Sequence, residues 1–160
     1  MLIKKGERFN LSKNDLLDFT VNIEWDSTNY EIDSVIFLLK ENKASDNNII
    51  FSNNPIGAND SVVLKDNEAS KEIKFDLNSL PDDIDKIVIT LTIENPQNFG
   101  QVSNLTMKID KNLTYNLDKF SHETAITLIE IYKKNSEWRL KAVGTGFVSG
   151  LDTICSGFGI

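Results

Sequence analysis

Three carboxylates stand close together directly ahead of an apolar segment. Asp26, Glu31 and Asp33 lie within eight residues of one another, and the stretch Val35–Leu39 follows them. Like charges at this spacing repel one another, so either water screens them or a cation offsets them. The group therefore predicts a cation-binding loop or a solvated acidic loop, and the spacing alone leaves both readings open.

A second polar stretch, KDNEAS at residues 65–70, offers further oxygen ligands. Hard cations such as calcium bind about six to eight oxygens from carboxylates, amides and backbone carbonyls. The residues after Asp26 lack the spacing and the glycine pivot of an EF-hand, so a calcium site would need ligands from two loops. If the fold brings the two stretches to one end, the candidate metal ligands are Asp26, Glu31, Asp33, Asp66, Asn67 and Glu68.

Residues that commonly carry catalysis are scarce. His122 is the one histidine and Cys155 the one cysteine, so the chain forms no internal disulfide and has no second histidine for a zinc site. Neither residue sits in a recognisable nucleophile motif, and there is no phosphate-binding P-loop. These observations favour a protein without enzymatic activity. The alternative is an enzyme or small-ligand-binding protein that uses the acidic loops as its site.

Composition narrows the classes of partner. The formal net charge is -7 and the pI is about 4.7, which argues against nucleic acid, because phosphate binding needs a basic surface. No segment has the apolar length of a signal peptide or of a membrane-spanning helix. We therefore expect a cytoplasmic protein that does not insert into membranes.

The dominant pattern is short segments of β-branched and aromatic residues separated by polar clusters. EIKFDL alternates strictly between apolar and polar residues, while KIVITLTI is apolar throughout, as a central strand buried on both faces would be. The pattern predicts an all-β fold, an antiparallel β-sandwich of two sheets with a few short helical turns, in one domain over residues 1–160. The expected strands are Phe19–Trp25, Ser34–Leu39, Ile49–Phe51, Ser61–Leu64, Glu72–Asp76, Lys86–Ile93, Leu105–Ile109 and Thr114–Leu117.

Two further structural expectations concern the C-terminal part and the core. The segment Glu123–Arg139 fits either a helix or two strands, and its β-branched residues followed by a polar turn favour a hairpin. The last dozen residues should form a turn or a short helix. We also expect one core that contains Phe37, Phe75, Ile87, Ile89 and Leu91.

Short motifs follow one another along nearly the whole chain. The most specific is QNFGQ at residues 97–101. The others, in order, are Lys5-Gly6, Asn10-Leu11-Ser12, Trp25-Asp26, Glu31-Ile32-Asp33, Phe51 to Asn54, Asp66-Asn67, Asp76-Leu77, Leu80-Pro81, Ser121, Glu123-Thr124-Ala125 and Glu137-Trp138. This ordered set resembles the TerD family of tellurium-resistance and stress-response proteins.

The resemblance implies a β-sandwich with calcium held among acidic loops, in a cytosolic bacterial stress protein. It also implies strands rather than a helix in Glu123–Arg139. Tellurite resistance, phage inhibition and colicin tolerance are associated with the family, and no catalysis is established for it. The implied partners are other proteins, such as paralogous TerD-like proteins or a membrane-associated stress complex.

The chain departs from the family pattern in the second acidic loop. The family carries an extended acidic segment here, which the short stretch Leu64–Lys71 replaces, and Lys71 stands near the family's last acidic position. Fewer anions and an added ammonium predict weak calcium binding, with a dissociation constant on the order of 10⁻⁴ M or larger. Lys65 or Lys71 could then act as a built-in counter-ion. The alternative is a metal-free structural subunit of a larger assembly.

The QNFGQ motif predicts a buried aromatic ring. Phe99 lies between Pro96 and Gly100, and an exposed ring between two polar residues would gain nothing. We expect Phe99 to plug one end of the sandwich and Gly100 to adopt a backbone angle that other residues resist.

Overall fold

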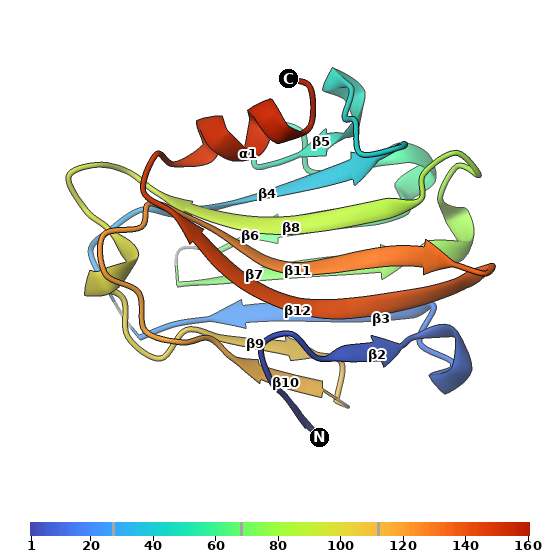
Figure 1. The fold of residues 1–160 in the computed structure, drawn as a ribbon, viewed down its shortest axis with the longest axis horizontal. Coiled ribbons are helices and arrows are strands. Elements are labelled where there is room, and N and C mark those ends of the chain that lie inside the picture. The colour runs from blue at the N-terminus through green and yellow to red at the C-terminus, as the bar shows by residue number, and fades with distance from the viewer. Residues whose placement is uncertain (27, 68, 112) are drawn as a thin grey trace.

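The computed structural model describes residues 1–26, 28–67, 69–111 and 113–160. They form two sheets that pack face to face, with several 3₁₀ turns and one α-helix (Figure 1). The strand orders are β1-β10-β9-β3-β7-β6 and β2-β12-β11-β8-β4-β5. The expected all-β sandwich is confirmed.

The first sheet is antiparallel except at one edge. There the N-terminal β1 runs parallel to β10, with Leu2 opposite Thr114. Strand β1 has two residues and therefore shows no alternation that the sequence could reveal. The strands of this sheet are β1 (Leu2–Ile3), β3 (Asp18–Glu24), β6 (Val62–Asp66), β7 (Ser70–Asp76), β9 (Thr106–Ile109) and β10 (Leu113–Asn116).

The second sheet contains the hairpin favoured by the sequence, because β11 and β12 pair antiparallel. Its β8 lies between β11 and β4, and Ile87 to Leu91 are buried on both faces, as the apolar run predicts. The strands are β2 (Arg8–Asn10), β4 (Ile32–Leu39), β5 (Ile49–Ile50), β8 (Lys86–Ile93), β11 (Ala125–Lys134) and β12 (Glu137–Phe147).

The buried apolar side chains fall into two clusters rather than one. Ile87, Ile89, Leu91 and Phe75 lie in the main cluster between the sheets. Phe37 lies in a second cluster, because successive side chains of a strand point to opposite faces and Phe37 faces away from the core that Ile36 and Leu38 enter. The expectation that Phe37 shares one core with the others is wrong.

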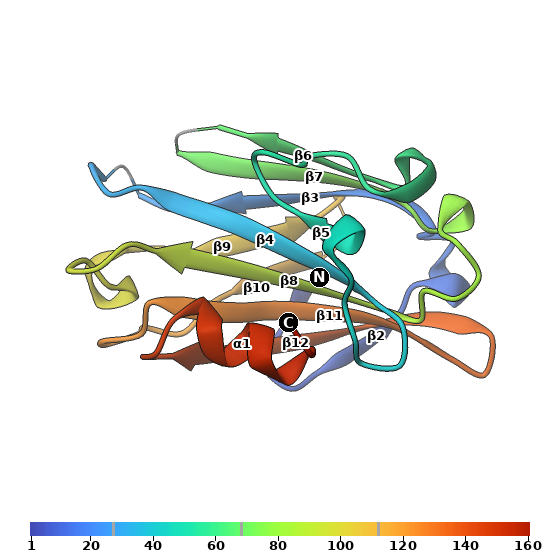
Figure 2. The ribbon, with the colours of Figure 1, turned by 90° about the horizontal axis from the view of Figure 1, so that it is seen from above.

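Helix α1 (Leu151–Gly157) covers this second cluster on the outer face of the second sheet (Figure 2). Ile154 is buried there, and the Phe158 ring lies 5.1 Å from the Phe37 ring between centroids. The short C-terminal helix expected from the sequence is therefore the cover that hides the outer apolar face of β4. Within the described ranges, no helix is long and apolar enough to cross a membrane.

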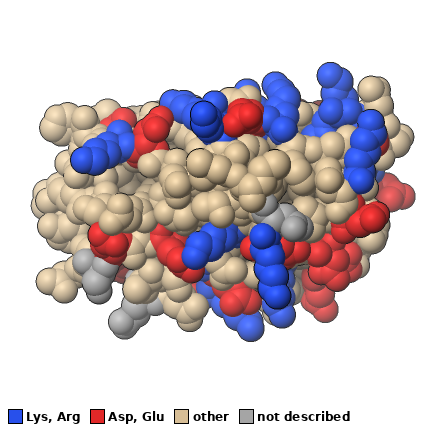
Figure 3. Space-filling view, turned by 90° about the horizontal axis from the view of Figure 1, so that it is seen from below, with Lys and Arg blue, Asp and Glu red and all other residues tan. Residues whose placement is uncertain are grey.

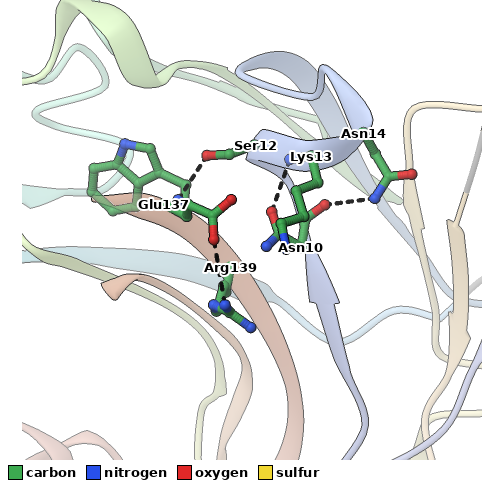
Figure 4. A network of polar contacts seen from close by, with 7 residues as sticks. Asn10, Ser12, Lys13, Asn14, Glu137 and Arg139 are labelled. Carbon is green, nitrogen blue, oxygen red and sulfur yellow. Dashed lines mark hydrogen bonds and ion pairs between the residues drawn. The ribbon is translucent and has the colours of Figure 1, made fainter. Parts of the chain in front are cut away.

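Two of the family-like motifs serve to fix the N-terminal segment (Figure 4). The Ser12 hydroxyl accepts a hydrogen bond from the Trp138 backbone N–H at 2.8 Å, and the Leu11 N–H donates to the Trp138 carbonyl at 2.9 Å. The Asn10 side chain accepts from the Lys13 N–H at 2.8 Å. Asn10-Leu11-Ser12 and Glu137-Trp138 thus meet in space and dock a 3₁₀ turn against β12.

The opposite end of the sandwich gathers the acidic loops. The β3–β4 and β6–β7 connections and the 3₁₀ turn Phe99–Gln101 lie at the left end of both Figure 1 and Figure 2. The β3–β4 connection joins the first sheet to the second, so side chains from both sheets meet there.

Candidate functional site

The acidic cleft, as we call it, is a hollow of about 520 Å³ between the segment that precedes β4 and the β6–β7 hairpin. It combines the first carboxylate-rich stretch with part of the second, although the two lie more than thirty residues apart in the chain. Its lining residues are Thr28, Asn29, Tyr30, Glu31, Ile32, Asp33, Asp66, Asn67 and Lys71.

Lys71 is the buried cation of the acidic cleft. Its side chain is 3 % exposed, and its ammonium forms an ion pair with the Asp66 carboxylate. The ammonium also donates to the Asn67 carbonyl oxygen at 3.2 Å and lies 5.9 Å from the centroid of the Trp25 ring. A carboxylate, a carbonyl and an aromatic face together replace the water that the charge loses on burial.

The lysine also acts on the far wall of the cleft. Burial is the main cause that raises the pKa of Asp33, and the charges of Glu31 and Asp66 raise it further. The charge of Lys71 opposes this rise. The first carboxylate group and the lysine of the second loop are thus in electrostatic contact, as expected for residues around one cleft.

The two lysines named from the sequence have different positions. Lys65 is 60 % exposed and lies 4.0 Å from the Glu72 carboxylate on the hairpin surface. An exposed pair of this kind contributes little to stability. Lys71 alone of the two lines the acidic cleft and forms an ion pair with one of its carboxylates.

Asp26 lies in a different cleft. Its carboxylate accepts a hydrogen bond from the Asn104 amide at 2.8 Å, and its N–H donates to the Ser103 carbonyl at 2.9 Å. This second cleft, about 370 Å³, is lined by Asp26 together with residues around Phe99 and Phe120. The strand β3 ends at Glu24, and the chain then turns so that Asp26 faces the β9 side.

Four of the six predicted metal ligands line the acidic cleft: Glu31, Asp33, Asp66 and Asn67. Asp26 does not join them, and Glu68 lies outside the described residues. The part of the chain that the structure describes contains no group of three His, Cys, Asp or Glu side chains placed to hold a metal. The Asp66 carboxylate and the Asn67 carbonyl are bound by Lys71 instead. This donor set does not fit a tightly held calcium ion.

The QNFGQ motif supports both clefts from the side. Phe99 is 1 % exposed, its ring lies 6.4 Å from the Phe120 ring, and its N–H donates to the Glu123 carbonyl at 2.8 Å. The expected burial of Phe99 is confirmed. The Gln101 amide donates to the Tyr30 hydroxyl at 3.3 Å, which links the motif to the wall of the acidic cleft.

Gly100 is required for a reason other than the expected one. Its φ does not lie in the left-handed region, so the predicted special backbone angle is wrong. A Cβ at this position would instead collide with the carbonyl oxygen of Ser121. The glycine permits close approach of two backbone segments.

Sequence reasoning missed two aromatic residues: Tyr30, which lines the acidic cleft, and Trp25, whose ring lies against the Lys71 ammonium. Trp25 was noted as a motif residue, but its ring contact with Lys71 depends on the pairing of β3 with β7, which sets Ile23 opposite Lys71. Tyr30 carries no local signal beyond its position between Asp26 and Glu31. The register of a sheet cannot be read from a single strand.

The two residues considered for nucleophilic catalysis show no activation. Burial is the main cause that raises the pKa of the Cys155 thiol, with a smaller contribution from Asp152, so the reactive thiolate is disfavoured. His122 is exposed, and Cys155 belongs to helix α1. Neither residue lines the acidic cleft.

Comparison with known proteins identifies the family. The TerD domain matches residues 1–158. General stress protein 16U of Bacillus subtilis (strain 168) is 34% identical over 99% of this chain and 96% of its own length. Tellurium resistance protein TerD of Serratia marcescens is 31% identical over 99% of this chain and 96% of its own length. Both alignments are longer than this 160-residue chain, at 186 and 185 positions, so these relatives contain residues that it lacks.

A solved structure shares the fold. The crystal structure of a homologue of the telluride resistance protein (TerD) from Streptomyces coelicolor A3(2) superposes with a TM-score of 0.71. The likeness covers 88% of this chain and 96% of that one at 16% sequence identity. The match of the domain over residues 1–158, the two relatives and this shared fold agree, and the chain belongs to the TerD domain family.

Proposed function

We propose that the protein is a non-enzymatic, cytoplasmic stress-response module of the tellurium-resistance type that acts through contacts with other proteins. The observation that carries the proposal is the match of the TerD domain over residues 1–158. Relatives that are similar along nearly their whole length are named as stress and tellurium-resistance proteins. The stress-response context is shared by these relatives, while the mode of action is our inference.

Three features favour protein contacts over catalysis. Burial disfavours the thiolate of Cys155, the candidate nucleophile, and neither Cys155 nor His122 lines the acidic cleft. On the face drawn in Figure 3, basic and acidic side chains are interspersed, as on a surface without a single-sign field for nucleic acid. The β5–β6 connection exposes two large apolar side chains, Phe51 and Ile56. Paralogous TerD-like proteins or a membrane-associated stress complex are the partners we propose.

For calcium we propose weak binding at the acidic cleft, with a dissociation constant on the order of 10⁻⁴ M or larger. The support is the donor set. Lys71 is bound to Asp66 and to the Asn67 carbonyl, and Asp26 lies in the other cleft. Titration calorimetry of the purified protein with calcium chloride measures this constant directly, and a micromolar value would refute the proposal.

The function is tested in cells that carry the gene. Deletion should increase sensitivity to tellurite, and the wild-type gene should restore resistance. The double variant Phe51→Ser/Ile56→Ser should fold but fail to restore resistance, whereas a control at the exposed Lys74 (Lys74→Ser) should restore it. Unchanged tellurite sensitivity after deletion would contradict the stress role. Full rescue by the double variant would contradict the contact surface.

Partners are tested with purified proteins. Each paralogous TerD-like protein of the same genome is mixed with this protein, and the mass of the complex is measured by analytical ultracentrifugation. A complex that the double variant weakens supports the proposal. If this protein stays separate from every paralogue and from membrane fractions of stressed cells, the proposed partners are wrong.

A second candidate function is a metal-free structural subunit of a larger assembly. The specific observation that favours it is the ion pair of Lys71 with Asp66, which offsets charge in the acidic cleft without a metal. This candidate predicts that the protein enters its complex equally well in EDTA and in calcium. If the stress module instead uses its weak calcium site, the amount of the complex should change between EDTA and millimolar calcium.

A further inference from the structure

A cation that belongs to the chain already lies in the acidic cleft. The Lys71 side chain is 3 % exposed, and its ammonium contacts the Asp66 carboxylate and, at 3.2 Å, the Asn67 carbonyl oxygen. Trp25 presents its ring to the same ammonium, with the centroid at 5.9 Å. Because a buried ammonium without partners is strongly unfavourable, these contacts fix the charge at this place.

The position of the charge joins the two sheets. Lys71 and Asp66 belong to β7 and β6 of the first sheet, and Asp33 belongs to β4 of the second. Glu31 and Asp33 form the opposite wall of the cleft. The ammonium therefore offsets repulsion between carboxylates that the fold brings together from two sheets, which is the task that a bound divalent cation would perform.

We propose that Lys71 is the internal counter-ion of the acidic cleft and the residue that determines whether the cleft binds a divalent cation. The inference rests on the weak calcium binding proposed above and names its cause. Lys71 uses one carboxylate and one carbonyl that a calcium ion would need as ligands, and its charge repels the ion. Removal of the ammonium releases both ligands and leaves Glu31, Asp33 and Asp66 without a cation.

The test is the variant Lys71→Met, which removes the charge and keeps an apolar stem against Trp25. Its dissociation constant for calcium, measured by titration calorimetry, should be at least about tenfold smaller than that of the wild type. Its Tm should rise from EDTA to millimolar calcium at constant ionic strength, because the ion stabilises the state that binds it. The wild-type Tm should change less over the same range.

Lys65→Met is the matched control. It removes the same charge from the same hairpin, but Lys65 is 60 % exposed and paired with Glu72 outside the cleft. Its calcium affinity should stay within about twofold of the wild type, because water and salt screen an exposed charge. The double variant Lys71→Met/Asp33→Asn should lose most of the affinity gained, which locates the new site in the cleft.

The outcomes separate the two proposals. Tight calcium binding by the wild type would refute the proposed weak binding. Unchanged affinity in Lys71→Met, or an equal gain in Lys65→Met, would refute the role of Lys71. If Lys71→Met is unfolded in EDTA, recovery of the fold in about 10 mM calcium supports the inference. Failure of both Lys71→Met and Lys71→Gln to fold in calcium would overturn it, since the ion should replace the ammonium.

Discussion

The aspartates of two neighbouring clefts at one end of the sandwich have different partners. Asp26 faces a neutral amide, Asn104, and lies beside the buried ring of Phe99. Asp33 and Asp66 lie around a buried ammonium. The cleft of Asp26 contains the buried Phe99 ring and a hydrogen bond from a neutral amide, whereas the acidic cleft contains an ion pair. The acidic stretch from Asp26 to Asp33 thus contributes to both clefts, through a structural turn at Asp26 and through a charged wall at Asp33.

The largest loss of stability is expected at the buried Phe99 ring. Phe99→Ala should lower the free energy of unfolding by about 3–5 kcal/mol, because a fully buried ring is removed and a cavity remains. Urea denaturation measures the change. Phe51→Ala, at a ring that is 37% exposed, is the control and should cost less than about 1 kcal/mol. A loss below about 1 kcal/mol at Phe99 would show that the ring is not a plug.

The next largest loss of stability is expected at the ion pair between Lys71 and Asp66. Asp66→Asn should destabilise the protein by about 1–3 kcal/mol, because the buried Lys71 ammonium loses its charged partner. Glu72→Gln is the matched control, since the Glu72 side chain is 30% exposed but pairs with the exposed Lys65 rather than with a buried ammonium, and it should cost less than about 1 kcal/mol. Both values come from the same urea denaturation series. Equal costs at the two positions would contradict the special role of the buried pair.

A smaller effect is expected at the far end of the sandwich, where one neutral hydrogen bond can be removed by itself. Ser12→Ala should cost about 1 kcal/mol, because the Trp138 backbone N–H loses its acceptor at 2.8 Å. The cost should be independent of salt, whereas that of Asp66→Asn should change with ionic strength. Urea denaturation at low and high sodium chloride checks both. A salt-dependent Ser12→Ala would contradict this assignment.

The smallest effect concerns pH. Burial and the charges of Glu31 and Asp66 raise the pKa of Asp33 in the folded protein, so the folded state binds this proton more tightly than the unfolded state. The resulting penalty is present above the folded pKa and disappears as the pH falls through it toward the unfolded value. Asp33→Asn should therefore be slightly more stable than the wild type at neutral pH, by less than about 1 kcal/mol for so open a side chain.

Removal of the Lys71 charge provides a control for the pH dependence. The stability difference between Asp33→Asn and the wild type should vanish below about pH 3, where the carboxyl is protonated in the unfolded state as well as in the folded state. In Lys71→Met the pKa of Asp33 should rise further, because the opposing charge is lost. A carbon-detected NMR titration of the Asp33 carboxyl measures both values. A lower pKa in Lys71→Met would contradict the contact between the two residues.

Much of the fold could be predicted because the order of apolar and polar residues within a segment indicates a strand. The apolar run Lys86–Ile93 gives β8 its observed bounds, and the alternation in EIKFDL places β7 except for its first two residues, Ser70 and Lys71. Strands β1 and β2 have two and three residues, too few to show a period, and were missed. The face of Phe37 was also missed, because an apolar run hides which side of a buried strand meets the core.

The candidate site could be predicted only in part because it depends on register and on the path of a turn. Glu31, Asp33, Asp66 and Asn67 meet as the motif order suggests. Lys71 lies two residues before Ile73 and therefore shares its buried face, but the expected strand began at Glu72 and left Lys71 out. Asp26 leaves the group because of its backbone contact with Ser103, a partner far along the chain.

Thermal melting of the wild-type protein tests whether Lys71 is the cation of the acidic cleft. Tm is measured in EDTA and in a calcium series at constant ionic strength, by circular dichroism. We expect no change of Tm at micromolar calcium and at most a small rise at millimolar calcium, because Lys71 already occupies the ligands. A large rise that is complete at micromolar calcium would contradict this role of Lys71.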